Sequence, residues 1–219
     1  MNILSRFALT IALLFCFSEA SILLAAPAGS AVFTYRRIFK ASTPEFIEIK
    51  INENSDTGSY EIRQLEDEPG ASRFEIGSGL RARIFELTSQ LHHFKGQDLD
   101  IHRKIANLGE KTFRWENGSE AYEVKFNYTI NAEASQLLQI CEGLARQLEL
   151  IDLLQRRIKY DRLGVNDAIL QLEIDFTKGV LPEPLRVLPL LDQISEDYHF
   201  VDIARQRARA LAERIRHAG

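Results

Sequence analysis

The stretch NAEASQLLQICEGLARQLELIDLLQRRIKYDR, residues 131–162, decides the fold of this chain. Its apolar residues recur at alternating spacings of four and three, which places them in one stripe on a helix. The stripe consists of Leu137, Cys141, Leu144, Leu148, Ile151 and Ile158. Asn131 can cap the first turn, and Gly164 is placed to end the helix in a left-handed conformation. The pattern predicts one helix about 45 Å long that forms the core of the protein or, in part, a coiled-coil seam.

Upstream of this helix, apolar and polar residues alternate with the period of two that is typical of half-buried strands. Five or six short strands are expected, at residues 33–39, 45–51, 60–65, 73–77, 111–115 and 120–129. Asn117-Gly118 predicts a two-residue hairpin turn, which would pair Phe113 with Tyr122. Apolar stripes predict two helices in the same region, near residues 79–94 with Ser78 as the cap, and near residues 98–108.

Downstream of Gly164 the pattern is helical. Prolines interrupt it, and a last helix is expected to bury Phe200, Ala204, Ala208, Leu211 and Ile215. We therefore expect an α+β protein. Residues 32–130 form an antiparallel β-rich region, and residues 131–219 form a mostly helical region built on the long helix. The change from strands to helices is expected to be a change of layer, with both regions packed as one domain.

The first 31 residues have the pattern of a secretory signal peptide. Arg6 precedes an apolar run over residues 7–17, and small residues follow that offer cleavage sites between about residues 20 and 31. The apolar run alone is too short to cross a bilayer, and an uncleaved anchor would have to accommodate Glu19. A lipoprotein is disfavoured because bulky Phe15 precedes Cys16. The sequence thus predicts a periplasmic or secreted protein, with an uncleaved anchor as the alternative.

Composition narrows the possible partners. The formal net charge is −4, with no basic excess that would point to a nucleic-acid partner. After cleavage Cys141 is the only cysteine, so no intramolecular disulfide can form and the core must hold the fold. No membrane span is expected in the mature chain. A protein partner, or a homodimer through the long helix, is expected if that helix exposes its stripe.

Residues 52–58 contain two motifs that suggest chemistry. Asp56-Thr57-Gly58 resembles the motif of aspartic proteases, but it occurs once and a polar stretch precedes it instead of an apolar strand. Asn52, Asn54 and Asp56 alternate as oxygen donors, as in a calcium loop, but the glycine and glutamate of such a loop are missing. An ordinary polar turn explains both motifs.

The remaining candidate residues also have structural explanations. His92, His93 and His102 lack the spacing of a metal site, and Cys141 lies within the apolar stripe, where a thiol is inert. Gly77-Ser78-Gly79 lacks the lysine of a phosphate loop. Other polar groups suit helix ends or a solvated face: Tyr160-Asp161-Arg162, and the arginines at 205, 207, 209, 214 and 216. The sequence therefore identifies no catalytic residue, metal ligand or cofactor.

Three classes of function remain. The first is a non-catalytic exported protein that binds a partner or is associated with the envelope. The second is an exported hydrolase whose active site forms only in the fold, and the third is a small-ligand carrier with a pocket between sheet and helices. We favour the first class, because every candidate catalytic group has a simpler explanation.

Overall fold

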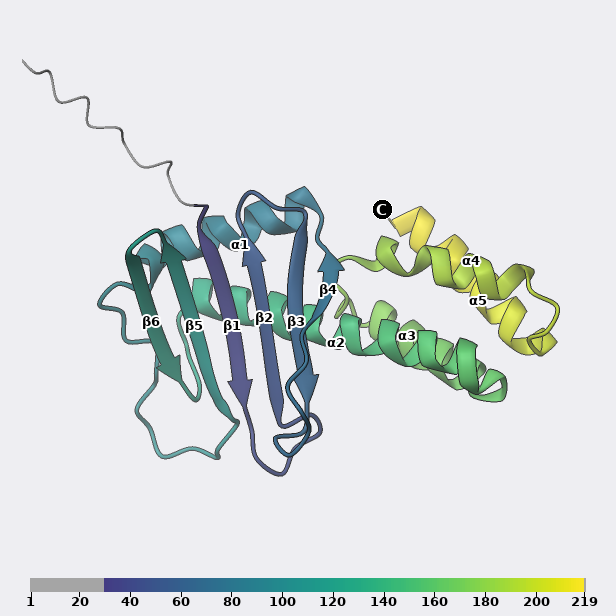
Figure 1. Ribbon diagram of the computed structural model, residues 1–219, viewed down its shortest axis with the longest axis horizontal. Coiled ribbons are helices and arrows are strands. Elements are labelled where there is room, and N and C mark those ends of the chain that lie inside the picture. Colours follow the sequence, from purple (N-terminus) through teal and green to yellow (C-terminus); the bar gives the residue numbers. More distant parts are fainter. Residues whose placement is uncertain (1–29, 219) are drawn as a thin grey trace, which may run out of the picture.

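The computed structural model describes residues 30–218. The predicted signal peptide lies almost entirely in residues 1–29, outside the described residues. The described part confirms the α+β prediction: six antiparallel strands come first and a mostly helical half follows, with a 29-residue helix between them. Figure 1 shows the sheet with helices α1 and α2 behind it, and a helical arm that extends to one side.

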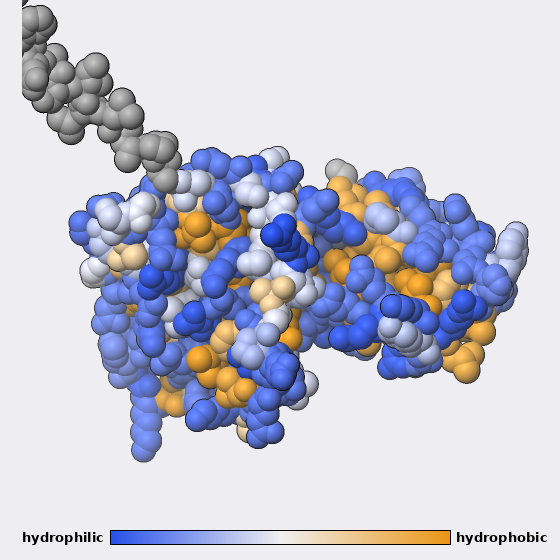
Figure 2. Space-filling model, in the orientation of Figure 1, coloured by the Kyte–Doolittle hydropathy of each residue, from blue (hydrophilic) through white to orange (hydrophobic). Residues whose placement is uncertain are grey.

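The sheet has the strand order β4-β3-β2-β1-β5-β6. The strands are β1 (Val32–Ile38), β2 (Phe46–Asn52), β3 (Thr57–Arg63), β4 (Ser72–Glu75), β5 (Glu110–Asn117) and β6 (Glu120–Phe126). Successive side chains of a strand point to opposite faces of the sheet, so Ile47, Ile49 and Ile51 of β2 all face the helices and are buried. The other face carries cross-strand ion pairs such as Arg36–Glu48, and Figure 2 shows hydrophilic side chains over most of it.

The β5–β6 hairpin forms where Asn117-Gly118 predicts it, but its register differs. Phe113 pairs with Val124 instead of Tyr122, because β5 continues to Asn117 and the turn consists of Gly118 and Ser119. Gly118 has φ +59°, a left-handed conformation that glycine adopts without strain. The register moves by two residues, so every side chain stays on its expected face.

Helix α1 (Ser78–Gln90) ends earlier than the expected residue 94, and a left-handed turn follows at η1 (His92–Phe94). Ser78 does not cap this helix, because Gly77 occupies the N-cap position. The helix expected at residues 98–108 is wrong, since the chain is irregular there. The Asp100 carboxylate accepts hydrogen bonds from the backbone N–H groups of Asn127 and Tyr128 beyond β6. This segment is therefore held by the end of the sheet, and competing side-chain hydrogen bonds disfavour a helix.

Helix α2 (Ala132–Tyr160) is the predicted long helix. The side-chain oxygen of Asn131 accepts from Ala134 N–H at 2.8 Å, which confirms the cap. The apolar stripe packs inside the chain, with Ile151 and Ile158 only partly buried, and contributes to two separate cores. Residues up to Leu148 pack with the sheet and α1, whereas Leu150 and Leu154 pack with the helices that follow. We call these two parts the sheet lobe (residues 30–148) and the helical arm (residues 150–218).

In the helical arm, the chain after α2 folds back so that α3 packs along the end of α2. It consists of η2 (Arg162–Gly164), α3 (Val165–Thr177), η3 (Pro184–Val187), α4 (Leu188–Glu196) and α5 (Asp202–Ala218). The expected stripe of the last helix is buried, from Phe200 to Ile215. Gly164 does not end α2 in a left-handed conformation: α2 ends at Tyr160, and the Asp161 carboxylate accepts from Gly164 N–H at 3.1 Å.

Candidate functional site

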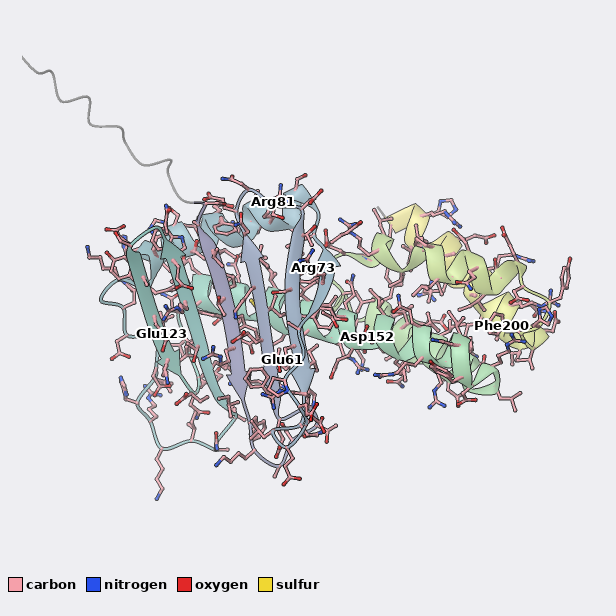
Figure 3. All side chains as sticks on the ribbon, in the orientation of Figure 1. Glu61, Arg73, Arg81, Glu123, Asp152 and Phe200 are labelled. Atoms are coloured by element: carbon pink, nitrogen blue, oxygen red, sulfur yellow. The ribbon has the colours of Figure 1, made fainter. Side chains whose placement is uncertain are left out.

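A groove of about 880 Å³ lies between α1 and the β5–β6 hairpin, and we call it the α1–hairpin groove. Arg81, Phe85 and Ser89 of α1 line one wall. Trp115, Asn117 and Glu120 of the hairpin, together with His93, line the other. Arg81, labelled in Figure 3, lies on α1 at the end of the sheet where β1 begins.

The wall at His93 is built by an unusual backbone. His92, His93 and Phe94 have φ values of 51°, 53° and 68°, so three consecutive non-glycine residues are left-handed. Such a conformation costs about 1–2 kcal/mol per residue. Burial of Phe94, whose ring lies 5.5 Å from that of Phe113, offsets part of this cost. Strained backbone of this kind is concentrated at ligand-binding and active sites.

A stack of rings holds the turn against the hairpin. The imidazole of His93 stacks on the indole of Trp115, with ring centroids 4.3 Å apart. The ring of Tyr122, whose residue pairs with Trp115 across the hairpin, is nearly parallel to the indole with ring centroids 6.2 Å apart. The ammonium group of Lys95 lies 5.2 Å from the ring of Tyr122. The stack therefore extends across the hairpin, and the strained turn fixes the position of His93 in the groove wall.

The charges around the groove are mainly negative. Glu53, Glu86 and Glu120 line it, against Arg81. The Arg81 guanidinium donates to the carbonyl of Ser55 at 2.8 Å, and Glu86 pairs with Arg83 outside the groove. Among residues 30–218, neither Glu53 nor Glu120 has a cationic partner within 4 Å. These two carboxylates can therefore accept a cationic ligand.

A smaller pocket of about 230 Å³ lies where α2 leaves the sheet lobe, near Asp152 in Figure 3. The Tyr60 hydroxyl donates to both carboxylate oxygens of Asp152 at 2.8 Å. Burial, followed by this hydrogen bond, raises the pKa of Tyr60, so the phenol stays protonated and cannot act as a general base near neutral pH. Buried Gln147 donates to the carbonyl of Glu183 and accepts from its N–H. These bonds connect the lobe to the arm, which is a structural role.

A third polar cluster lies between the sheet and α2. The Glu142 carboxylate accepts from the Tyr35 hydroxyl and from Arg37. The Lys111 ammonium donates to the carbonyls of residues 108, 109 and 127 at 2.9–3.1 Å. Burial raises the pKa of Tyr35 well above its ordinary value and lowers that of Lys111. Our sequence analysis missed this cluster, although Arg37 and Lys111 stand at inward positions of their strands, where a charge is unusual.

The residues of the two motifs at positions 52–58 form a turn. The Asn52 side chain accepts from the N–H of Asn54 at 2.9 Å, and Asp56 accepts from the Thr57 hydroxyl. Gly58 is required for packing, because an added Cβ would lie 2.6 Å from the ring of Phe74. Within residues 30–218 no three His, Cys, Asp or Glu side chains are arranged to hold a metal ion.

The other candidates from the sequence lie apart from one another. His93 is in the groove wall, whereas His102 bonds the Asp98 carboxylate at 2.7 Å in an exposed loop. Cys141 is buried, as predicted, and burial raises the pKa of its thiol. Asp161 pairs with Arg157 at the end of α2, while Tyr160 is exposed. Three arginines of α5 pair with carboxylates and Arg209 is exposed; the paired ones are Arg205, Arg214 and Arg216. Arg207 is half-buried, and one nitrogen of its guanidinium has no hydrogen-bond partner among the described residues.

No protein-family model matches this chain, and no curated protein sequence matches it. The site must therefore be interpreted from its own chemistry. In the described part of the chain, the histidine rings hydrogen-bond only the carboxylates of Asp98 and Asp197, and no serine, threonine or cysteine donates to them. The groove thus offers aromatic surface and carboxylates for binding, without a nucleophile–base pair.

Proposed function

We propose that this chain is an exported, non-catalytic binding protein whose α1–hairpin groove takes a cationic and partly apolar ligand, such as a basic peptide segment. The observation that carries the proposal is the left-handed turn at His92–Phe94, which a ring stack holds in the wall of the groove. A strained backbone lowers the stability of the folded protein, and it is typical of positions where binding requires a fixed surface. Phe85 and Trp115 supply apolar area, and Glu53 and Glu120 supply negative charge.

The alternative functions fit the described residues less well. A hydrolase needs an activated nucleophile, but Cys141 is buried and the Tyr60–Asp152 pair connects the lobe to the arm. A carrier of an apolar ligand needs an enclosed apolar cavity. The groove and the smaller junction pocket are instead each lined by several charged residues. Both features favour binding of a charged partner.

The proposed site of action is outside the cytoplasm, in the periplasm or the external medium. The apolar run at residues 7–17 and the small residues after it support export. Across residues 30–218, the helices are too short or too polar to cross a bilayer. A homodimer through α2 was expected only if that helix exposed its apolar stripe, and most of the stripe packs into the two cores of one chain, with Ile151 and Ile158 partly buried. A protein partner would therefore bind elsewhere, and the groove is the proposed place.

Trp115 makes the proposal testable, because it is the only tryptophan in the sequence and lies in the groove wall. The exported protein should be titrated with a short peptide of alternating lysine and leucine while indole emission is recorded. We expect a saturable change in emission. The double substitution Glu53→Gln and Glu120→Gln should weaken binding about thirtyfold, because each lost charge contact is worth on the order of 1 kcal/mol.

Two controls make the result specific. A matched peptide of alternating glutamate and leucine should not bind, since the groove is negative. Glu110→Gln removes a carboxylate at the far end of β5, where it pairs with Lys125, and should leave the affinity unchanged. The proposal fails if the lysine peptide gives no saturable change, or if Glu110→Gln weakens binding as much as the double substitution does.

A further inference from the structure

The outer end of the helical arm exposes a group of large apolar side chains. They lie in two places, the end of α2 with η2, and the loop between α4 and α5 with the first turn of α5. We call this group the arm tip; its members, with their exposed fractions, are Tyr160 (74%), Leu163 (77%), Tyr198 (86%), Val201 (39%) and Ile203 (58%). Arg162 of the first turn lies over the ring of Phe200 in the second, so the turns are neighbours. Phe200 is labelled in Figure 3 at this end of the arm.

The core of the arm does not need these side chains. Phe200, Val165 and Ala204 are buried directly beneath the tip and complete the packing of the helices. Polar residues would be the ordinary choice at exposed turns. Exposed apolar side chains leave their area in water at a cost of about 25 cal/mol per Å², which contact with another surface would recover.

Cations surround the apolar side chains of the tip. The ammonium group of Lys159 lies 4.9 Å from the ring of Tyr160, and the guanidinium of Arg205 lies 4.9 Å from that of Tyr198. Among the described residues, Lys159 and Arg162 have no carboxylate within 4 Å.

The carboxylates nearest the tip each have a cationic or histidine partner. These pairs are Asp161 with Arg157, Asp197 with His199, and Asp202 with Arg205. His199 balances Asp197 only when its ring is protonated, so among the described residues Lys159 and Arg162 are the cations of the tip that no ion pair uses. Asp167 and Glu196 lie about one turn behind the two turns and add negative charge there.

We propose that the arm tip docks on a membrane surface that carries anionic lipid headgroups. Leu163 and Ile203 would enter the interface, the two tyrosines would lie at headgroup level, and Lys159 and Arg162 would contact phosphate. A bilayer fits better than a protein partner, because a specific protein interface buries about 800 Å² on each side and needs a complementary surface. Five side chains on two turns provide less area, whereas a bilayer accommodates any projecting end.

Vesicle flotation with the exported protein tests this inference. Vesicles of phosphatidylcholine with about one-third phosphatidylglycerol should bind the protein about thirtyfold more tightly than phosphatidylcholine alone, since two basic side chains contribute about 1 kcal/mol each. High salt should remove this difference. The variant Leu163→Ser with Tyr198→Ser should reduce binding at least about tenfold, and Lys159→Gln with Arg162→Gln should abolish the preference for anionic lipid.

Ile130→Ser is the matched control, because Ile130 is 72% exposed on the sheet lobe and lies far from the arm tip in sequence. It should bind vesicles as the unmodified protein does, and circular dichroism should show that all variants keep their helices. The inference is overturned if neither vesicle binds, or if Ile130→Ser loses as much binding as the tip variant. Self-association that the tip variant abolishes, without vesicle binding, would instead identify the tip as a contact between copies of the chain.

Discussion

The sheet lobe and the helical arm share one helix but have cores of different chemistry. Aromatic rings fill the core of the sheet lobe, among them Phe33, Tyr35, Phe94, Phe113 and Trp115. The core of the arm is aliphatic apart from Phe200, with alanines where helices approach one another. The core of the sheet lobe is therefore built from larger side chains than the core of the arm.

The polar groups differ in the same way. The sheet lobe buries Lys111 and the Tyr35–Glu142–Arg37 cluster, and it contains the strained turn at His92–Phe94. The arm keeps most of its charges in surface pairs such as Arg216–Asp192, although Asp175 of α3 is buried and pairs with Arg146 of α2. Buried polar groups constrain a fold to one arrangement only if every partner is in place. We infer that buried polar groups constrain the conformation of the sheet lobe more strongly than that of the arm, and that the arm is a regular helical extension.

The largest effect is expected from one substitution in each half of α2, which tests whether the two cores are separate. Leu137→Ala and Leu154→Ala both remove a fully buried leucine, the first from the sheet-lobe core and the second from the arm core. Each should cost about 2–5 kcal/mol. Leu137→Ala should lower the urea midpoint of Trp115 fluorescence, which reports the sheet lobe. Leu154→Ala should lower the midpoint of helical circular dichroism more than that of fluorescence.

Equal shifts of both signals in both variants would contradict the division into two cores. They would show that α2 couples the sheet lobe and the arm into one cooperative unit.

A second test addresses the junction between the two parts. Gly143 of α2 lies against the segment that leads from α3 to η3, and an added Cβ would be 2.5 Å from the carbonyl oxygen of Val180. Gly143→Ala should therefore destabilise the protein by about 1–3 kcal/mol, although alanine favours a helix. Gly79→Ala is the control, because nothing lies within 4 Å of its Cβ position in α1. The control should be neutral or stabilising by about 0.5–1 kcal/mol, as measured by thermal unfolding.

Alkaline pH tests the buried tyrosines. The folded protein raises the pKa of Tyr35 and of Tyr60 above the ordinary value of 10.0. Above that pH the folded state keeps protons that the unfolded state loses, so the free energy of unfolding falls as pH rises. The slope is at most about 1.4 kcal/mol per pH unit for each tyrosine. Lys111, whose pKa is lowered from 10.5, acts in the opposite direction only below that value.

Urea unfolding between about pH 10.5 and pH 12 should therefore show a decreasing stability that Tyr35→Phe and Tyr60→Phe each make less steep. An unchanged slope in both variants would mean that neither phenol is held protonated by the fold.

The sequence predicted those parts of the structure that depend on local patterns. The stripe of α2, its Asn131 cap and the position of the hairpin follow from spacing and turn chemistry. The pattern failed at residues 98–108, where the helical spacing was present but the backbone bonds to Tyr128 instead. It also could not show that Gln147 and Glu183 would meet, because contacts between distant segments depend on the assembled fold.

The candidate site was the least predictable part for the same reason. His93 and Trp115 are 22 positions apart, and only the sheet brings their rings together. The left-handed turn that places His93 contains no glycine, the residue that usually indicates such a conformation. Its residues instead continue the apolar spacing of α1 through Leu91 and Phe94, which is why a longer helix was expected.

The smallest expected effect concerns this turn and separates strain from contact. His92 and His93 are both left-handed, but only His93 stacks on Trp115. His92→Gly should relieve backbone strain at the expense of some unfolded-chain entropy, for a net stabilisation of about 0.5–1 kcal/mol. His93→Gly relieves similar strain but also loses a ring contact worth about 0.5–1.5 kcal/mol, so it should be neutral or destabilising. Both changes should appear in the Trp115 transition of the sheet lobe. If both glycine variants stabilise it equally, the ring stack does not hold the groove wall.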